Sequence, residues 1–193
     1  MAVTNWVPTW QLLVPRAIAD KMGLKPKGVH GAKSARGFWS QAGTPFAMEA
    51  GSFLSPLEVP CSKPPFGVLY AVDLRTGKIR WERPLGTMRD SGPFGIPVGL
   101  TIAMGVLTSG GALITEGGLV FVAATQGRTF RAISLADWKT LWSARLPAGG
   151  QAVPMTYFSP KSGRQLVVVA AGGKGLIQSP TGDSLVAYGL PDL

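Results

Sequence analysis

The residues of this sequence that could carry acid, base or metal chemistry are few and scattered. The 193-residue chain has one histidine, His30, and one cysteine, Cys61. A serine, histidine and aspartate triad needs a histidine beside its nucleophile, and a thiolate zinc site needs several cysteines. Cys61 alone also excludes a disulfide within the chain, and the acids form no cluster suited to a divalent cation. The sequence therefore assigns no catalytic residue and no metal ligand.

Other ionisable side chains and glycines concentrate in segments that we expect to be loops. The ionisable ones are Lys63, Arg89, Asp90, Arg128, Lys174 and Asp183. Gly172, Gly173 and Gly175 surround Lys174, and glycines let a backbone approach a planar ligand closely. A glycine-rich loop at a strand end is more often only a turn, so both interpretations stay open.

Strands must position these loops, because the chain carries an internal repeat. The segments 69–81, 130–142 and 185–193 align on Ala71, Ala132 and Ala187, and the first two end in Trp81 and Trp142. We interpret the tryptophans as packing residues. Two further strands precede each of the second and third copies. The clearest unit has strands at 111–115, 118–125, 129–135 and 139–146, and four-stranded repeats of this length are typical of β-propeller blades.

The fold class predicted is all-β, a partial β-propeller. Glycine (26) and proline (16) are frequent and lie between short apolar runs, as expected for many turns. We expect residues 1–42 to be an irregular basic lead-in with one helical turn near 15–22, and residues 43–193 to form about two and three-quarter blades. That is too few to close a ring. The opening residues do not predict a signal peptide, and no apolar window predicts a transmembrane helix.

The predicted strand order also sorts the loops onto two faces. Loops entering the first strand of a blade, and loops joining its second and third strands, share one face. That loop face receives residues 61–67, 85–110, 126–128, 148–152 and 172–183. Functional loops gather on one face of a rigid scaffold, so a binding site is expected there.

The residues now indicate a family. GTPF (43–46), CSKPPFGVLYAVDLRTGKIRWERPLGT (61–87), LPAGGQAVPMTYFSPKSGRQLVVVAAGGKG (146–175) and GDSLVAYGLP (182–191) together resemble the C-terminus of membrane-bound, pyrroloquinoline quinone (PQQ)-dependent dehydrogenases that oxidise glucose, quinate or shikimate. The run AGGQAVPMTY with the strand VVVAAGG is the most specific part.

The resemblance implies an eight-bladed propeller that holds PQQ with Ca²⁺ or Mg²⁺, oxidises a polyol and passes electrons to ubiquinone at the periplasmic face of the inner membrane. It implies that the catalytic base and the metal ligands come from earlier blades. Positions that match its cofactor-side loops are Thr108, Ser109, Gly110, Gln126, Gly172, Gly173 and Lys174. The family usually has aspartate where this chain has Gln126, and histidine where it has Lys174.

Three functional interpretations follow. The first is the C-terminal part of a quinoprotein dehydrogenase, inactive as an isolated chain. The second is a non-enzymatic propeller module that completes a ring with a partner chain that supplies the missing blades. The third uses the net charge of +9 and the basic residues between 16 and 36 to bind an anionic surface, with steep salt dependence. We expect no nucleic-acid partner.

Overall fold

The computed structural model describes residues 1–26, 37–173 and 178–190. The chain divides into two compact units, and each is described by itself. The first contains residues 1–6, 57–59 and 63–193, and the second contains residues 7–56 and 60–62. In the first unit the described residues form three antiparallel sheets, and in the second they form a small sheet with one helix.

The first sheet of the larger unit is built on the hairpin of β5 (Gly67–Val72) and β6 (Ile79–Pro84). Its turn is stabilised by an aspartate side chain and a glycine. The Asp73 Oδ1 atom accepts from the Arg75 N–H at 2.9 Å, and Gly77 takes a φ of +69°, which favours glycine. A third strand, β1 (Ala2–Asn5), pairs antiparallel with the other edge of β5.

The second sheet is the four-stranded unit expected from the sequence. Its strands are β7 (Ala112–Ile114), β8 (Leu119–Val122), β9 (Thr129–Ser134) and β10 (Thr140–Arg145), in the spatial order β10-β9-β8-β7. Each strand lies inside its predicted range, and every neighbouring pair is antiparallel. The predicted blade is therefore confirmed.

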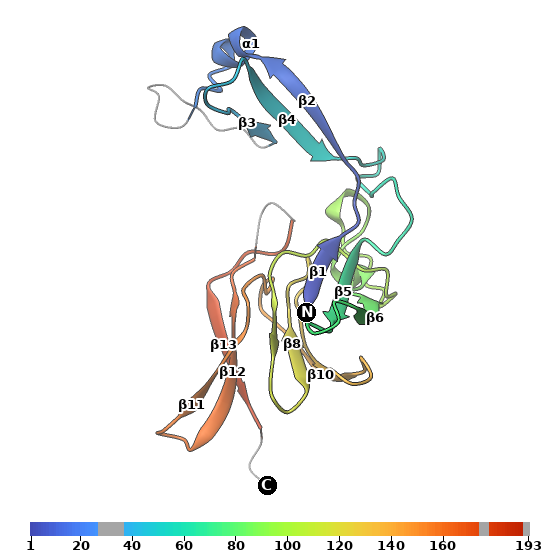
Figure 1. Cartoon of the computed structure of the whole chain (residues 1–193), viewed down its shortest axis with the longest axis vertical. Helices are drawn as coiled ribbons and strands as arrows, with labels where there is room; N and C mark the ends of the chain where they lie inside the picture. The colour runs from blue at the N-terminus through green and yellow to red at the C-terminus, as the bar shows by residue number, and fades with distance from the viewer. Residues whose placement is uncertain (27–36, 174–177, 191–193) are drawn as a thin grey trace. The chain divides into compact units, whose positions relative to one another are not determined.

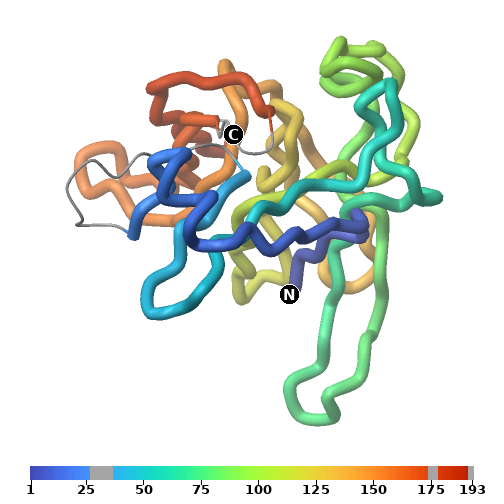
Figure 2. The backbone as a smooth tube through the Cα atoms, turned by 90° about the horizontal axis from the view of Figure 1, so that it is seen from above, coloured from blue at the N-terminus to red at the C-terminus, as the bar shows by residue number. Residues whose placement is uncertain are grey.

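The third sheet has the three strands predicted for the last copy of the repeat. They are β11 (Met155–Ser159), β12 (Arg164–Ala171) and β13 (Ser184–Gly189), with β12 in the centre. Figure 1 shows these strands next to the second sheet, and Figure 2 follows the same backbone from above.

Two apolar cores stack the three sheets in chain order. The first lies between the first and second sheets and contains Leu69, Leu85, Val120, Val122, Ala124 and Ile133. The second lies between the second and third sheets and contains Ala123, Phe130, Leu146, Ala148, Val169 and Ala171. Phe130 is fully buried, and burying such a side chain contributes about 2–3 kcal/mol.

The repeated tryptophans join neighbouring sheets, as their interpretation as packing residues requires. Trp81 packs against the first core and donates its indole N–H to the Leu135 carbonyl of the second sheet at 2.8 Å. Trp142 stands edge-on to Tyr188 of the third sheet, with ring centroids 4.9 Å apart. One position of the repeat thus performs the same task at two interfaces.

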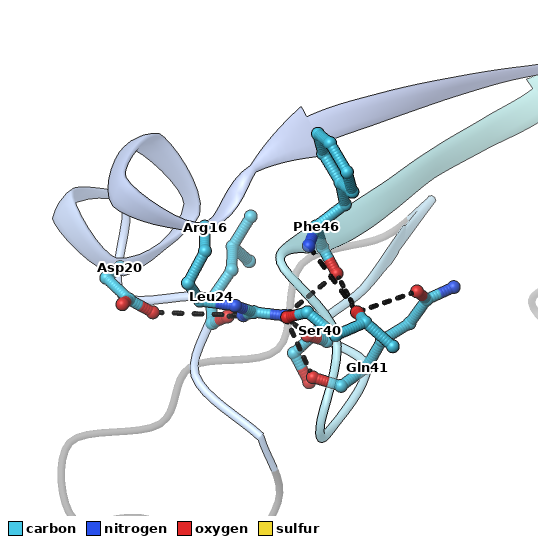
Figure 3. Close-up of polar contacts among 7 residues, drawn as sticks. Arg16, Asp20, Leu24, Ser40, Gln41 and Phe46 are labelled. Carbon is cyan, nitrogen blue, oxygen red and sulfur yellow. Dashed lines mark hydrogen bonds and ion pairs between the residues drawn. The ribbon is translucent and has the colours of Figure 1, made fainter.

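The smaller unit pairs β2 (Thr9–Pro15) and β3 (Phe38–Trp39) with the central strand β4 (Phe46–Ser52), beside helix α1 (Arg16–Lys21). Its core contains Val14, Ala19, Leu24 and Ala47. Figure 3 shows how Arg16 holds this unit together. The Arg16 guanidinium donates to the carbonyl oxygens of Ser40 at 2.7 Å and Phe46 at 2.9 Å.

Two expectations about the beginning of the chain need correction. The helical turn near 15–22 is present as α1, but an irregular backbone before residue 43 is wrong for residues 2–5 and 9–15, which form β1 and β2. Strand β4 pairs with β2 and β3 and does not begin the first blade. Pairing over a long sequence separation depends on tertiary contacts that local pattern does not reveal.

Candidate functional site

The loops that the strand order assigned to one face are joined by backbone hydrogen bonds in the larger unit. The Phe66 N–H donates to the Met104 carbonyl at 3.0 Å, and the Gln126 N–H donates to the Leu107 carbonyl at 2.8 Å. The Gly149 N–H donates to the Pro180 carbonyl at 2.9 Å. The described residues between 63 and 183 therefore confirm the predicted grouping. Cys61 and Ser62 belong to the smaller unit.

Long irregular backbone supplies most of this loop face. Between β6 and β7, residues 85–111 contain two short 3₁₀ helices, η1 (Met88–Asp90) and η2 (Pro93–Gly95). The Thr87 hydroxyl caps η1 by accepting from the Arg89 N–H at 3.4 Å. This cap begins the turn that brings Asp90 toward the second sheet.

Thr108, a predicted cofactor contact, is held by Asn5 of the first sheet. The Asn5 Oδ1 atom accepts from the Thr108 N–H at 2.8 Å and from its hydroxyl at 2.9 Å, and Asn5 Nδ2 donates to the Thr108 carbonyl at 2.9 Å. Thr108 is only 4% exposed. The hydroxyl hydrogen is used inside the protein, so Thr108 can offer a ligand only an acceptor lone pair.

Ser109, Gly110 and Gln126 lie beside Thr108 in a short two-stranded extension of the second sheet. Thr108 and Thr125 form an isolated antiparallel bridge, and the Ser109 N–H donates to the Ala124 carbonyl at 2.8 Å. Gly110 has a φ of +139°, and a Cβ there would lie 2.4 Å from the Gln151 carbonyl oxygen. These three predicted residues are brought together, and a role for them in cofactor binding stays a prediction.

Gln151, in the AGGQA loop, was not among the predicted site residues. Its Nε2 donates to the Thr125 carbonyl at 2.5 Å, which fixes the carboxamide, while its buried Oε1 has no hydrogen-bond partner among the residues that the structure describes. A buried acceptor without a partner costs free energy, so a fixed Oε1 is suited to receive a donor from a ligand. The AGGQA motif was visible in the sequence, but the pairing with Thr125 was not.

Gly172 and Gly173 join the AGGQA loop to the last long loop. The Gly173 N–H donates to the Gly149 carbonyl at 2.8 Å. Gly173 has a φ of +69°, and a Cβ there would lie 2.1 Å from the Pro180 carbonyl oxygen, whereas a Cβ on Gly172 would meet nothing closer than 3.7 Å. Glycine at 173 is thus required by the loop's own packing. Lys174 lies outside the described residues.

Sequence reasoning placed Asp90 on the loop face but did not find its partner, Arg145 of β10. Two guanidinium nitrogens of Arg145 donate to the two carboxylate oxygens of Asp90 at 2.5 and 2.6 Å. The backbone N–H of Arg128 donates to the same carboxylate at 3.1 Å. Burial by itself would raise the pKa of Asp90, but the Arg145 and Arg128 contacts outweigh burial and hold that pKa below its ordinary value.

These contacts determine what the site can do chemically. A carboxylate bound by two guanidinium nitrogens is a poor general base, because taking up a proton would break the ion pair. Among the described residues no three His, Cys, Asp or Glu side chains come together to hold a metal ion. The described residues therefore do not supply a set of ligands for the divalent cation, whose ligands the resemblance places in earlier blades. What they offer a ligand is hydrogen bonding, positive charge and a rigid backbone edge.

The fit to PQQ is partial. PQQ is a planar tricarboxylate, and an arginine is the usual partner of a carboxylate. The two buried side-chain polar atoms that have no partner in the described part of the chain, Arg128 Nε and Gln151 Oε1, belong to loops of this face. Gln151 Oε1 could accept a hydrogen bond from a ligand, and Arg128 Nε could donate one to a carboxylate of the cofactor or of the substrate. The rest of its surroundings would have to come from elsewhere.

The basic lead-in does not present its best-placed arginine to an anionic surface. The Arg16 guanidinium is engaged by main-chain oxygens of Leu24, Ser40, Gln41 and Phe46 and by the Asp20 carboxylate, as Figure 3 shows. Lys27, Lys33 and Arg36 lie outside the described residues, as does His30.

Comparison with known proteins gives a consistent family. Residues 1–167 match the family model described as "PQQ: Glucose/ethanol/alcohol dehydrogenase, beta-propeller domain". The chain is 44% identical to the quinate/shikimate dehydrogenase (quinone) of Acinetobacter baylyi over 94% of its own length and 22% of that protein. It is 52% identical to a probable quinate dehydrogenase (quinone) of Xanthomonas campestris pv. juglandis over 78% of its own length and 19% of that protein.

A third relative acts on a different alcohol. The quinoprotein glucose dehydrogenase of Escherichia coli is 40% identical over 96% of this chain and 23% of that enzyme. The chain thus spans about a fifth of the length of the curated relatives that it matches.

Proposed function

Because this chain belongs to the PQQ-dependent dehydrogenase family with a β-propeller domain, we propose that it forms the C-terminal part of a quinone-linked dehydrogenase that oxidises a cyclitol of the quinate or shikimate class. The observation that carries the proposal is the similarity to two quinate dehydrogenases over most of the chain. We expect no activity from the chain by itself, because the resemblance implies that the catalytic base and the metal ligands come from earlier blades.

The architecture of the larger unit supports a structural role for this chain within a longer propeller. Three stacked sheets expose apolar residues on their outer surfaces, such as Ile79 of β6 (56% exposed) and Leu185 of β13 (75% exposed). Blades of a propeller bury such surfaces against further blades. We propose that residues 63–193, together with β1, contribute the last blades of a ring completed by the rest of the protein.

In this role the chain provides part of the wall around the reacting alcohol. PQQ, when bound, would accept the hydride of the substrate alcohol. Residues of the loop face would bind and orient: the Gln151 Oε1 atom as an acceptor, the Arg128 guanidinium as a donor to a carboxylate, and the Thr108–Gly110 backbone as a rigid edge. The proton acceptor would come from another part of the protein.

The family resemblance also supports a location. We propose that the complete protein works at the periplasmic face of the inner membrane and passes electrons to ubiquinone. In the chain itself, no helix within the described residues has both the length and the apolar character of a membrane span.

The proposal is tested with a chimera. The C-terminal fifth of the Acinetobacter baylyi quinate/shikimate dehydrogenase is replaced by this chain, and quinate oxidation with an artificial quinone is measured with and without added PQQ. We expect PQQ-dependent quinate oxidation within about tenfold of the parent enzyme, and little with glucose. The isolated chain is the control and should give none. A soluble chimera that retains PQQ but oxidises neither quinate nor shikimate would contradict the proposal.

A further inference from the structure

Three arginines lie near the Asp90 carboxylate in the larger unit, and a fourth lies near one of these arginines. The Asp90 side chain is 10% exposed and is bonded through both oxygens to Arg145. Arg128, in the loop before β9, and Arg131, in β9, interact electrostatically with Asp90, and Arg83, in β6, interacts with Arg131. The cluster therefore carries more positive than negative charge.

The strands place these arginines on one side of the second sheet. On β9, Phe130 and Ala132 point one way, and Phe130 lies in the core shared with the third sheet. Arg131 points the other way, like Ile133, which lies in the core shared with the first sheet. Arg83 reaches across from β6, and its guanidinium donates to the Trp138 carbonyl and, at 3.2 Å, to the Thr140 hydroxyl.

Most of this positive charge is not matched by a carboxylate. In the described part of the chain, the acceptors of Arg83 and Arg131 are neutral oxygens. Arg145 occupies both oxygens of Asp90. Burial, followed by the charge of Arg83, lowers the pKa of Arg131 to about 10, against a smaller opposite effect of Asp90. Positive charge that is partly removed from water and has no carboxylate partner is costly, and an anion would relieve that cost.

Arg128 is the member with unused donor capacity. Its side-chain Nε is buried and has no hydrogen-bond partner within the described ranges. The guanidinium presents its N–H groups in a planar fork that matches two oxygens of a carboxylate or phosphate. Asp90 accepts from the Arg128 backbone N–H and is bound through both oxygens by Arg145, so it does not supply an acceptor for Arg128 Nε.

The geometry points to an oxyanion-binding site at Arg128, next to the Asp90–Arg145 pair, for a ligand that presents a carboxylate or phosphate group. Arg131 and Arg83 supply long-range positive charge, and Asp90 holds the Arg128 backbone in place. The inference that an oxyanion binds here does not depend on the proposed function. Occupation of the site by a cyclitol carboxylate rests on the proposed function, and such a contact would separate quinate from neutral polyols.

The test measures ligand binding to the whole purified chain by isothermal titration calorimetry at constant ionic strength in chloride. The probes are inorganic phosphate, quinate and the neutral cyclitol myo-inositol. We expect saturable binding of at least one anion and none of myo-inositol. Arg128→Gln should weaken that binding by about tenfold or more, the loss of a charge-assisted contact. Arg75→Gln, which removes the same charge from the exposed β5–β6 turn, should leave it unchanged.

The outcomes distinguish which kind of anion the site binds. Binding of quinate but not phosphate would identify a hydroxy-acid site, and binding of both would identify a general oxyanion site. If neither anion binds, or if Arg128→Gln and Arg75→Gln have equal effects, the inference is overturned. Since no catalysis is measured, a failure of the chimera would not affect this result.

Discussion

Asn5 and Thr108 are bound to one another through three hydrogen bonds, although 103 residues separate them in the chain. The Asn5 carboxamide satisfies the backbone N–H, the carbonyl and the hydroxyl of a threonine that is almost completely buried. This pair fastens β1 of the first sheet to the segment that begins the loop face. The order of that face therefore depends on a residue near the start of the chain.

Replacing Asn5 with alanine should reduce stability substantially. Three polar groups of Thr108 would lose their partners, and a buried group without a partner costs about 1–3 kcal/mol. We expect the free energy of unfolding, measured with urea, to fall by about 2–3 kcal/mol in total. Gln165→Ala removes an exposed carboxamide from β12 and should change it by less than about 0.5 kcal/mol. Equal effects of the two variants would show that the Asn5–Thr108 pair is unimportant.

The two repeated tryptophans should respond differently to replacement by phenylalanine. Trp81 loses a hydrogen bond to Leu135 of the next sheet, which contributes about 1 kcal/mol. The ring contacts of Trp142 with Phe130 and Tyr188 can be kept largely by phenylalanine. In denaturation experiments the free energy of unfolding of Trp81→Phe should be lower than that of Trp142→Phe. The reverse order would contradict the structure.

The Asp90–Arg145 pair should make stability depend on acid pH. The pKa of Asp90 is lower in the folded chain than its ordinary value of 3.8. The unfolded chain therefore binds the proton more readily, and the stabilisation is fully present well above pH 3.8 and lost as pH falls through the folded pKa. Asp90→Asn should cost on the order of 2 kcal/mol at pH 7.

The check is urea unfolding at about pH 7 and about pH 3, on either side of the ordinary carboxyl pKa. The difference between the wild-type chain and Asp90→Asn should shrink at the lower pH, because the Asp90 carboxyl of the unfolded wild-type chain takes up a proton there and the folded one does so less readily. Asp183→Asn, which removes an exposed carboxylate of the last long loop, serves as the control for charge loss. A wild-type advantage over Asp90→Asn that is the same at both pH values would show that the ion pair does not stabilise the fold.

Gly173 and Gly163 form a matched pair for testing the loop that precedes Lys174. Both have a positive φ, of +69° and +64°, so alanine at either site costs about 1 kcal/mol of backbone strain. A Cβ on Gly163 meets nothing within 4 Å, whereas one on Gly173 lies 2.1 Å from the Pro180 carbonyl oxygen. Gly173→Ala should therefore cost about 3 kcal/mol and expose the loop to limited proteolysis. Similar proteolysis of both variants would be evidence against the described packing.

Local pattern was sufficient for much of the fold. The alignment of 69–81 with 130–142 located both hairpins. The predicted strand order then assigned the long loops to one face. These features are local or periodic, so a single sequence contains them.

The contacts that complete the site are not local. Strand β1 lies more than 60 residues before its partner β5, and 55 residues separate Asp90 from Arg145. Nothing in the types or spacing of these residues indicates their pairing. For the same reason the sequence marked Thr108 as a ligand contact, although Asn5 already uses its hydroxyl hydrogen. Whether a side chain can reach a ligand depends on which other residues of the fold it already binds.

We expect this chain to be an incomplete propeller that binds its cofactor only with the missing blades. This dependence is tested most directly by size-exclusion chromatography with light scattering, following PQQ absorbance in the protein peak. The samples are the chain alone, the Acinetobacter baylyi quinate/shikimate dehydrogenase without its matching C-terminal fifth, and the two together. Only the mixture should form a stable complex that retains PQQ. Retention of PQQ by the isolated chain, or failure of the two parts to associate, would contradict this interpretation.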